Sequence, residues 1–466
     1  MIPVRASGLL LEFCETGVLV PADVHVALRL ARLGNEPSEL VQLAAALAVR
    51  GVRTGSVCLE LATVAESVVP IEAELDDSGP LEEPGAAVPD DRPVELPWPP
   101  LDAWLAAVER SPVVAVGRDS AWRPLRFVDG LLYLDRYWRQ EELVRRELDQ
   151  RAARQPPAAD LSSLDALFGP QGEPMQRLAA TVAASRWVSV ITGGPGTGKT
   201  HTVARLLKLL LSQPGRAPRI ALAAPTGKAA ARLKESVQEQ AGAIGLPADL
   251  DASTLHRLLG WRPDSRSRFK HHAGNHLPYD VVIVDESSMV SLTLMARLLE
   301  AVAPTARLVL VGDADQLTSV EAGAVLSDLV QRPAPVTAVA TEYPDAAGLV
   351  EEARRQLRNG VVRLQVPHRY GERIGALAEA IRTGDADGAV DLLRAGGQRD
   401  AGAGAGPGAG ARPEAAPQVN LTDSMDELRA DIEQSAAQLR SAAAAGDAAG
   451  ALQLLGRHRL LCGHRR

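Results

Sequence analysis

Aromatic residues and cysteines are scarce in this sequence of 466 residues. Phe, Trp and Tyr make up 3% of the chain, so cores in a sequence that is 46% hydrophobic must rest on Leu, Val and Ala. The three cysteines, Cys14, Cys58 and Cys462, lie far apart and form no C-x-x-C pair. This spacing supports neither a disulfide framework nor a zinc site, and we expect free thiols in a reducing compartment.

Long apolar runs and an excess of basic charge are also missing. No run approaches the roughly 20 apolar residues of a membrane helix. Glu12 and Glu15 interrupt the apolar N-terminus, which does not fit a signal peptide, and we expect a cytoplasmic protein. The net charge of −8 argues against a histone-like nucleic-acid binder. It does not exclude a motor with one basic channel, because net charge says nothing about local charge.

The patterns of helices and strands divide the chain into three parts. Residues 22–66 have helical apolar spacing, an acidic Pro-rich linker covers 72–100, and a hairpin-like stretch at 113–138 precedes a charged helix. The sequence QPPAADLSS (155–163) is typical of a hinge. We therefore predict a mainly helical N-terminal domain over residues 1–165.

Short β-branched runs alternate with helical stretches from residue 185 onward. This pattern predicts buried parallel strands in an α/β domain over residues 166–345. The runs are WVSVIT, RIALAA, DVVIVDE and ARLVLVGD. We predict that VVRLQV (361–366) is the first strand of another such unit, over residues 346–466. The Gly/Ala/Pro tract at 396–417 is expected to be disordered.

The segment GGPGTGKT matches the phosphate-binding pattern G-x-x-x-x-G-K-[ST]. A predicted strand precedes it and a helix follows, so its glycines let backbone N–H groups and the helix N-terminus face a phosphate. Lys199 would reach the β- and γ-phosphates and Thr200 would hold Mg²⁺. The alternative is a Gly-rich turn without a ligand. The predicted loop comprises Gly193, Gly194, Pro195, Gly196, Thr197, Gly198, Lys199 and Thr200.

A second pattern, VVIVDESS, places two carboxylates at the end of a buried strand. Asp285 can orient Mg²⁺ in a phosphate-binding site, and Glu286 can act as the general base for the attacking water. The alternative is that Asp285, Glu286 and Ser287 only cap the next helix.

Two further helix starts, APTGKAAARL and STLHRLLG, carry polar residues after strands. Thr226 can be an N-cap, or the segment can grip a nucleic-acid phosphate through Lys228. His256 can likewise be structural or face a ligand.

Two isolated residues complete the candidate set. Gln316, in VGDADQLTSVEAG, can sense a γ-phosphate because an amide both donates and accepts hydrogen bonds. Arg369, in VPHRYGERIGALAEAI, can act as an arginine finger. The alternatives are a surface-loop residue and a solvated arginine.

Together these motifs resemble the superfamily 1 helicases, and more closely the RecD family of exodeoxyribonuclease V subunits. They occur in the family's order with similar gaps, and DVHVALRLARL, VCLEL and LLYLDRYWRQEELV extend the resemblance into the first domain. The resemblance implies a RecA-like P-loop motor domain with a parallel sheet, an incomplete second RecA-like domain, and a mainly helical N-terminal domain that docks on RecC. It also implies ATP and Mg²⁺ as cofactors, DNA as substrate, RecB and RecC as partners, and 5′ to 3′ movement in double-strand break repair.

The resemblance also assigns roles to single residues. Gln176 would read the adenine ring, Gln316 would couple the γ-phosphate to DNA-contacting loops, and Arg369 would be a finger from the second motor domain. The residues that would face single-stranded DNA are Thr226, Lys228, Thr254 and His256.

Two departures from the family pattern affect these expectations. Thr318 stands where the family usually has Pro, and two further helicase motifs of the family lie beyond the end of this sequence. We expect that a chain ending at residue 466 binds ATP but hydrolyses it poorly and does not unwind DNA. A scaffold subunit and a stand-alone RecD-like helicase remain the alternatives.

Overall fold

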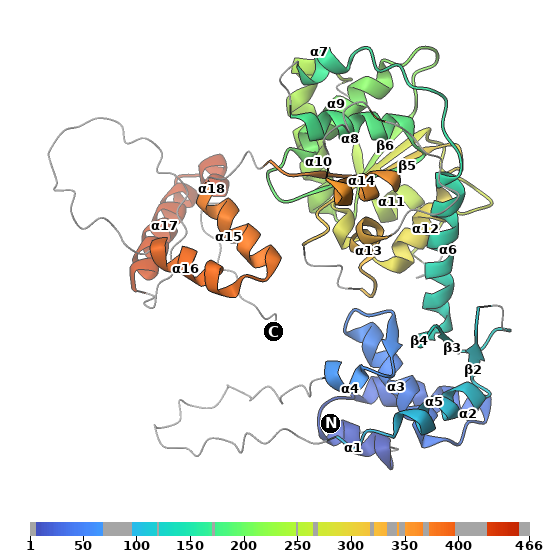
Figure 1. Cartoon of the computed structure of the whole chain (residues 1–466). Helices are drawn as coiled ribbons and strands as arrows, with labels where there is room; N and C mark the ends of the chain where they lie inside the picture. Colours follow the sequence, from blue (N-terminus) through green and yellow to red (C-terminus); the bar gives the residue numbers. More distant parts are fainter. Residues whose placement is uncertain are drawn as a thin grey trace. The chain divides into compact units, whose positions relative to one another are not determined.

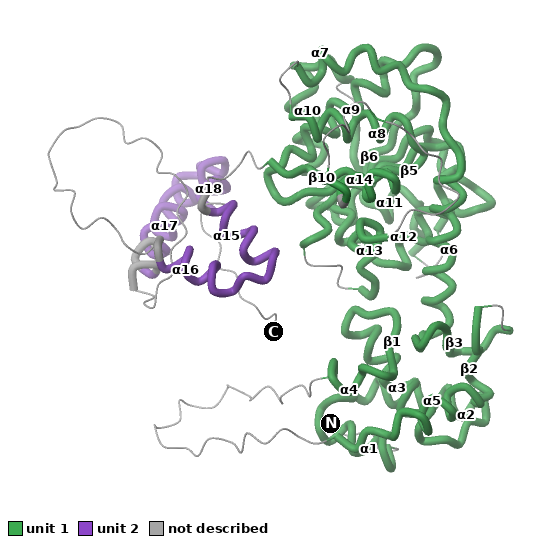
Figure 2. Tube along the Cα trace, in the orientation of Figure 1, with its two compact units in different colours: residues 1–368 green, residues 369–466 purple. Residues whose placement is uncertain are grey.

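The computed structural model describes residues 6–68, 96–118, 121–169, 173–247, 250–263, 269–316, 321–332, 343, 350–366, 372–396 and 426–455. It divides into two compact units, Met1–His368 and Arg369–Arg466 (Figure 2). Among the described helices, none is long and apolar enough to cross a membrane.

Helices dominate the N-terminal part of the first unit, as predicted. They are α1 (Leu9–Glu15), α2 (Pro21–Gly34), α3 (Glu39–Arg53), α4 (Val64–Ser67) and α5 (Leu101–Arg110). Leu43 and Leu47, four residues apart on α3, are fully buried in the core of this part. Trp104 of α5 packs into the same core, and its indole N–H donates to the carbonyl of Leu40 at 2.8 Å.

A small sheet completes this part, with the order β1-β4-β3-β2. Its strands are β1 (Cys58–Glu60), β2 (Val114–Val116), β3 (Leu125–Val128) and β4 (Leu131–Leu134). Strands β3 and β4 are antiparallel and are joined by Asp129 and Gly130, with φ of 53° and 82°. Two left-handed residues suit the twist of a two-residue hairpin turn, so the predicted hairpin is confirmed here.

The charged helix α6 (Asp135–Ala152) begins directly after β4 but ends against the motor domain. Its Val144 and Leu148 belong to the core formed with helix α12 and the large sheet. Arg151, near its end, donates to the carbonyls of Leu299 and Val302 at 3.3 and 2.8 Å. Two apolar residues four positions apart are enough to bury one face of a helix whose remaining surface is charged. This packing crosses the boundary that we predicted at residue 165.

The large sheet has six parallel strands in the order β10-β5-β9-β8-β6-β7. They are β5 (Val188–Gly193), β6 (Ile220–Ala224), β7 (Ala252–Thr254), β8 (Val281–Val284), β9 (Arg307–Gly312) and β10 (Val361–Leu364). Strands β5, β6, β8 and β9 confirm the four predicted runs. The assignment of residues 361–366 to a second unit is wrong, because β10 pairs with β5 from Val361↔Val190 to Leu364↔Gly193.

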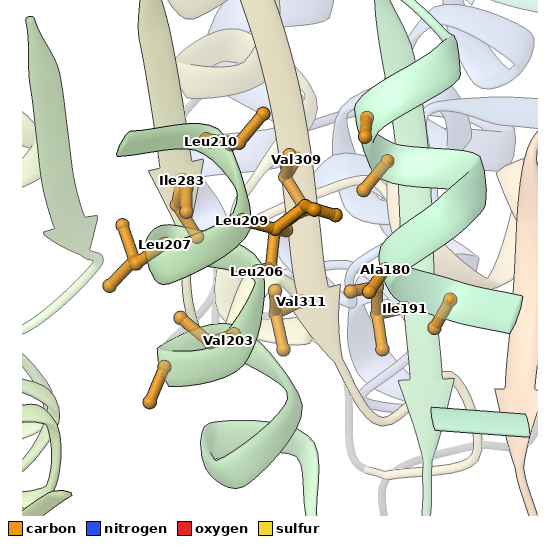
Figure 3. Close-up of a cluster of buried hydrophobic side chains, with 14 of the residues drawn as sticks. Ala180, Ile191, Val203, Leu206, Leu207, Leu209, Leu210, Ile283, Val309 and Val311 are labelled. Carbon is orange, nitrogen blue, oxygen red and sulfur yellow. The ribbon is translucent and has the colours of Figure 1, made fainter. Parts of the chain in front are cut away.

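Helices cover both faces of this sheet, because five of its six strands bury alternate side chains in two cores. On one face lie α7 (Leu164–Phe168), α8 (Pro174–Ser185), α9 (Lys199–Leu211), α10 (Gly227–Ile244) and α14 (Glu351–Arg358) (Figure 1). On the other lie α6, α11 (Leu255–Leu259), α12 (Leu292–Ala301) and α13 (Val325–Gln331). Figure 3 shows leucines of α9 against Ile283, Val309 and Val311 of the sheet. This doubly covered parallel sheet confirms the predicted fold class of the motor domain.

The described residues of the second unit are helical. They form α15 (Glu372–Thr383), α16 (Ala386–Gly396), α17 (Asp426–Ala444) and α18 (Ala448–Leu455). The incomplete second RecA-like domain stays a prediction. Most of the Gly/Ala/Pro tract, residues 397–417, lies outside the described residues.

A buried ion pair at the start of α6 gives a test of this architecture. Arg126 and Asp135 are both 1% exposed and their side chains are 2.6 Å apart, whereas Arg139, the second partner of Asp135, is half exposed. Asp135→Ala should lower the free energy of unfolding by about 3–5 kcal/mol, because it leaves Arg126 buried without its counter-ion. Arg139→Ala should cost only about 0–1 kcal/mol. Urea unfolding of the whole chain checks this, and equal effects of the two changes would contradict it.

Candidate nucleotide-binding site

The predicted phosphate loop connects β5 to α9 at the carboxyl edge of the sheet. Gly196 and Gly198 have φ of 78° and 85°, in the left-handed region that favours glycine. Gly193 has no room for a side chain, because a Cβ there would lie 2.7 Å from the carbonyl oxygen of Leu364. Among the described residues, no side chain caps the N-terminus of α9. The N-terminus of this helix follows the loop directly, and the positive end of a helix dipole favours an anionic ligand.

Lys199, the first residue of α9, folds back over this loop. Its Nζ donates to the carbonyl oxygens of Gly193 and Gly194 at 2.6 and 2.9 Å. Thr200 follows on the first turn of the helix and is half-buried. The loop thus brings a cation and a hydroxyl to the end of β5, as the sequence predicted for a phosphate and its metal ion.

Asp285 lies directly after β8 and is half-buried. Its Oδ1 accepts from the N–H of Glu286 at 2.9 Å. Burial raises the pKa of Asp285 to about 6, while the N–H of Glu286 and the charge of Lys199 oppose that rise. The influence of Lys199 shows that the carboxylate and the loop lysine act on each other. A half-buried carboxylate of raised pKa gains stability from a divalent cation, so this residue fits a Mg²⁺ ligand.

Glu286 has the left-handed φ of 52°, which is uncommon for a residue with a side chain. It stands before the short 3-10 helix η1 (Ser287–Met289), and no described side chain caps that helix. Helix α12 takes its cap from Ser291, whose Oγ accepts from the N–H of Leu294 at 3.4 Å. The geometry does not support the alternative that Asp285 and Glu286 serve only as helix caps.

Gln316 lies in the loop that follows β9, the strand between β5 and β8. The buried Asp313 fixes this loop, since its Oδ1 accepts from the N–H of Asp315 at 3.1 Å and its carbonyl from Gln316 at 3.3 Å. The hydroxyl of Thr192, at the end of β5, accepts from the N–H of Ala314 at 3.2 Å. The residue Gln316 is exposed. The structure therefore brings the predicted sensor loop beside the phosphate loop.

Gln176, on α8, lies against the phosphate loop. It is 5% exposed, and its Nε2 donates to the carbonyl of Thr197 at 3.4 Å. A Cβ on Gly198 would collide with the same amide. Its contact with adenine stays a prediction, but the side chain does support the loop that would hold the phosphates.

The residues predicted to face DNA begin two helices at the same edge of the sheet. The hydroxyl of Thr226 accepts from the N–H of Ala229, and that of Thr254 from Arg257, each at 3.2 Å. Both threonines are therefore N-caps, of α10 and α11. Lys228 and His256, in the first turns, are exposed. Arg369 and Thr318 lie outside the described residues, so their predicted roles stay predictions.

One ion pair near the site was not predicted from the sequence. Arg363 of β10 contacts Asp315 through Nη1 and Nη2 of its guanidinium, at 2.7 and 3.3 Å. The only local signal was an arginine within the apolar run VVRLQV. Its partner is remote in the sequence, so neither spacing nor periodicity could have identified it.

Replacement of Gly198 tests the geometry of the loop. Gly198→Ala should weaken ATP binding by about 5- to 30-fold, because left-handed backbone costs an alanine about 1–2 kcal/mol and the new Cβ collides with Gln176. The control is Gly215→Ala, at φ 98° with no described atom within 4 Å of the added Cβ, which should bind ATP normally. Titration with a fluorescent ATP analogue measures both. Unchanged affinity of the Gly198 variant would contradict this account of the loop.

Two family models match parts of this chain. The family model for the RecBCD enzyme subunit RecD, N-terminal domain, matches residues 15–133, and the model for an AAA domain matches residues 176–322. The ATP-dependent RecD2 DNA helicase of Deinococcus radiodurans is 44% identical over 34% of this chain and 20% of its own length.

Longer matches come from two mycobacteria. The RecBCD enzyme subunit RecD of Mycolicibacterium smegmatis is 48% identical over 98% of this chain and 72% of its own length. The protein of the same description from Mycobacterium tuberculosis is 46% identical over 99% of this chain and 70% of its own length. At this identity and coverage, the chain belongs to the RecD family, the helicase subunits of the RecBCD enzyme.

Proposed function

We propose that this chain is an ATP-driven DNA helicase subunit that moves 5′ to 3′ and acts with RecB and RecC in double-strand break repair. The observation that carries the proposal is the convergence of Lys199, Asp285 and the loop of Gln316 at one edge of the sheet, in a chain of the RecD family. Because its proposed substrate is chromosomal DNA, we propose the cytoplasm as its place of action.

The phosphate loop supplies the binding half of the proposed reaction. Backbone N–H groups at the start of α9 and the cation of Lys199 would hold the phosphates of ATP. Thr200 and Asp285 would hold Mg²⁺, which neutralises charge on the phosphates when bound. Since the pKa of Asp285 is raised to about 6, the carboxylate is ionised above that pH and is then able to bind the cation.

The two residues beside the phosphates supply the hydrolytic half. Glu286 would accept a proton from water at its carboxylate, held in place by a backbone turn that the surrounding structure fixes. Gln316 would contact the γ-phosphate through its amide. The guanidinium of Arg369 would place a positive charge beside the same phosphate.

The proposed DNA path follows the helix starts at the same edge. Strands β6 and β7 are neighbours and parallel, so α10 and α11 begin close together. Lys228 and His256 are exposed in these first turns and can contact backbone phosphates, with Thr226 and Thr254 fixing the helix ends. The match to the RecD N-terminal domain over residues 15–133 supports RecC as the docking partner of this part of the chain.

A lysine pair on α9 provides the test. Lys199→Ala should weaken ATP binding by the chain about 10- to 150-fold, because a hydrogen bond to a charged group contributes about 1.5–3 kcal/mol. It should also remove DNA-stimulated ATP hydrolysis and 5′ to 3′ unwinding contributed by this subunit in a complex assembled with RecB and RecC. The control is Lys208→Ala, in the last turns of α9, where Nζ donates to the carbonyl of Gly245 at 2.9 Å.

The outcomes separate a motor from a scaffold. If Lys199→Ala leaves hydrolysis and unwinding of the complex unchanged, this subunit is a scaffold and the proposed function fails. If Lys208→Ala has the same effect as Lys199→Ala, the loss comes from damage to α9 and not from the phosphate site.

A further inference from the structure

Three residues on neighbouring strands lie at the same level of the large sheet. Thr192 of β5 is paired with Gly312 of β9 on one side and with Arg363 of β10 on the other. All three residues stand at the carboxyl edge, directly before or beside the phosphate loop. The loop after β9 therefore begins next to two side chains, the hydroxyl of Thr192 and the guanidinium of Arg363, that can hold it.

Both side chains do hold it. The hydroxyl of Thr192 accepts from the N–H of Ala314 at 3.2 Å, and Thr192 is 1% exposed. Nη1 and Nη2 of Arg363 donate to the carboxylate of Asp315, at 2.7 and 3.3 Å. A two-point contact of this kind fixes the orientation of a carboxylate as well as its position. Residues 314 and 315 are thus fixed immediately before Gln316.

A role in protecting the sheet edge does not account for this arginine. β10 is an edge strand, and edge strands often carry charged residues that point to solvent. The side chain of Arg363 is 26% exposed and that of Asp315 is 41% exposed, and Arg363 reaches across β5 to the loop that follows β9. β10 is also the last strand before the chain enters the second unit at Arg369.

We propose that Arg363 is a positioning residue, whose two-point ion pair with Asp315 holds the sensor loop so that Gln316 can reach the γ-phosphate. Through this pair the strand that leads to the second unit is tied to the loop that reads the nucleotide. The inference rests on the proposed function, and it concerns turnover and not nucleotide affinity. The Nζ of Lys199 donates to the carbonyl oxygens of Gly193 and Gly194, and Thr192 and Asp313 still hold the sensor loop when the pair is removed.

The test uses a double-mutant cycle in the complex with RecB and RecC. The variants are Arg363→Gln, Asp315→Asn, the combination of the two, and Arg363→Lys. The quantity measured is the DNA-stimulated ATP turnover of this subunit at saturating ATP. It is the turnover of the complex minus the turnover of the same complex with Lys199→Ala. ATP affinity and the thermal unfolding midpoint are measured for each purified chain.

We expect each single neutralising change to lower turnover about five- to tenfold, as for loss of a charged two-point contact. The double variant should be no slower than either single variant, because both remove the same interaction. The turnover of Arg363→Lys should lie between those of the unchanged chain and Arg363→Gln, since lysine keeps the charge but loses the fork of two donors. ATP affinity should change by less than about twofold.

The matched control is the exposed pair Arg358–Glu351 on α14, where Arg358→Gln and Glu351→Gln should leave turnover unchanged.

The outcomes separate this inference from the proposed function. Turnover that depends on Lys199 but is unaffected by Arg363→Gln would overturn the role of Arg363 and leave the motor intact. Effects that add in the double variant, or loss of ATP affinity together with a lower unfolding midpoint, would also overturn it. A complex in which Lys199→Ala removes no turnover contradicts the proposed function itself.

Discussion

Parallel alignment of the six strands is the constraint on which the candidate site depends. Because β5, β8, β9 and β10 run in the same direction, their carboxyl ends meet at one edge, and the loops that follow them must share it. Alternate side chains of β5, β6, β8, β9 and β10 are buried beneath helices on both faces, which leaves these strands little freedom to shift register. The core thus positions the strand ends that carry the phosphate loop, the carboxylates and the sensor loop.

Partial burial determines the electrostatics of the charged groups at this edge. Asp285 is shielded enough that its pKa rises to about 6, and the main opposing groups are a backbone N–H and the charge of Lys199. Lys199 itself is held by two carbonyl oxygens of the loop. A phosphate that bears a divalent cation satisfies both partners, because it offers anionic oxygens to the lysine and a cation to the carboxylate. The electrostatics of the site therefore match the ligand that the RecD family implies.

Local sequence patterns were sufficient to predict the elements whose signal lies in a continuous stretch of the chain. The runs of β5, β6, β8 and β9, and the Asp129–Gly130 hairpin turn, each carry their signal within a few residues. The three residues of β7, Ala-Ser-Thr, are too few and too polar to give such a signal. The neighbour of β10 and the destination of α6 could not be predicted, since both depend on pairing between distant segments. The same limit applies to Arg363, whose partner Asp315 precedes it by a helix-containing segment.

The central claim is that the loops after β5, β8 and β9 form one nucleotide site. Hydrogen–deuterium exchange of the chain, with and without Mg²⁺ and a non-hydrolysable ATP analogue, tests it most directly. The account predicts slower exchange at residues 193–200, 285–289 and 313–316 together, with no change at the opposite edge of the sheet, around residues 186–188 and 305–307. Protection confined to one of the three loops, or found at the opposite edge instead, would contradict it.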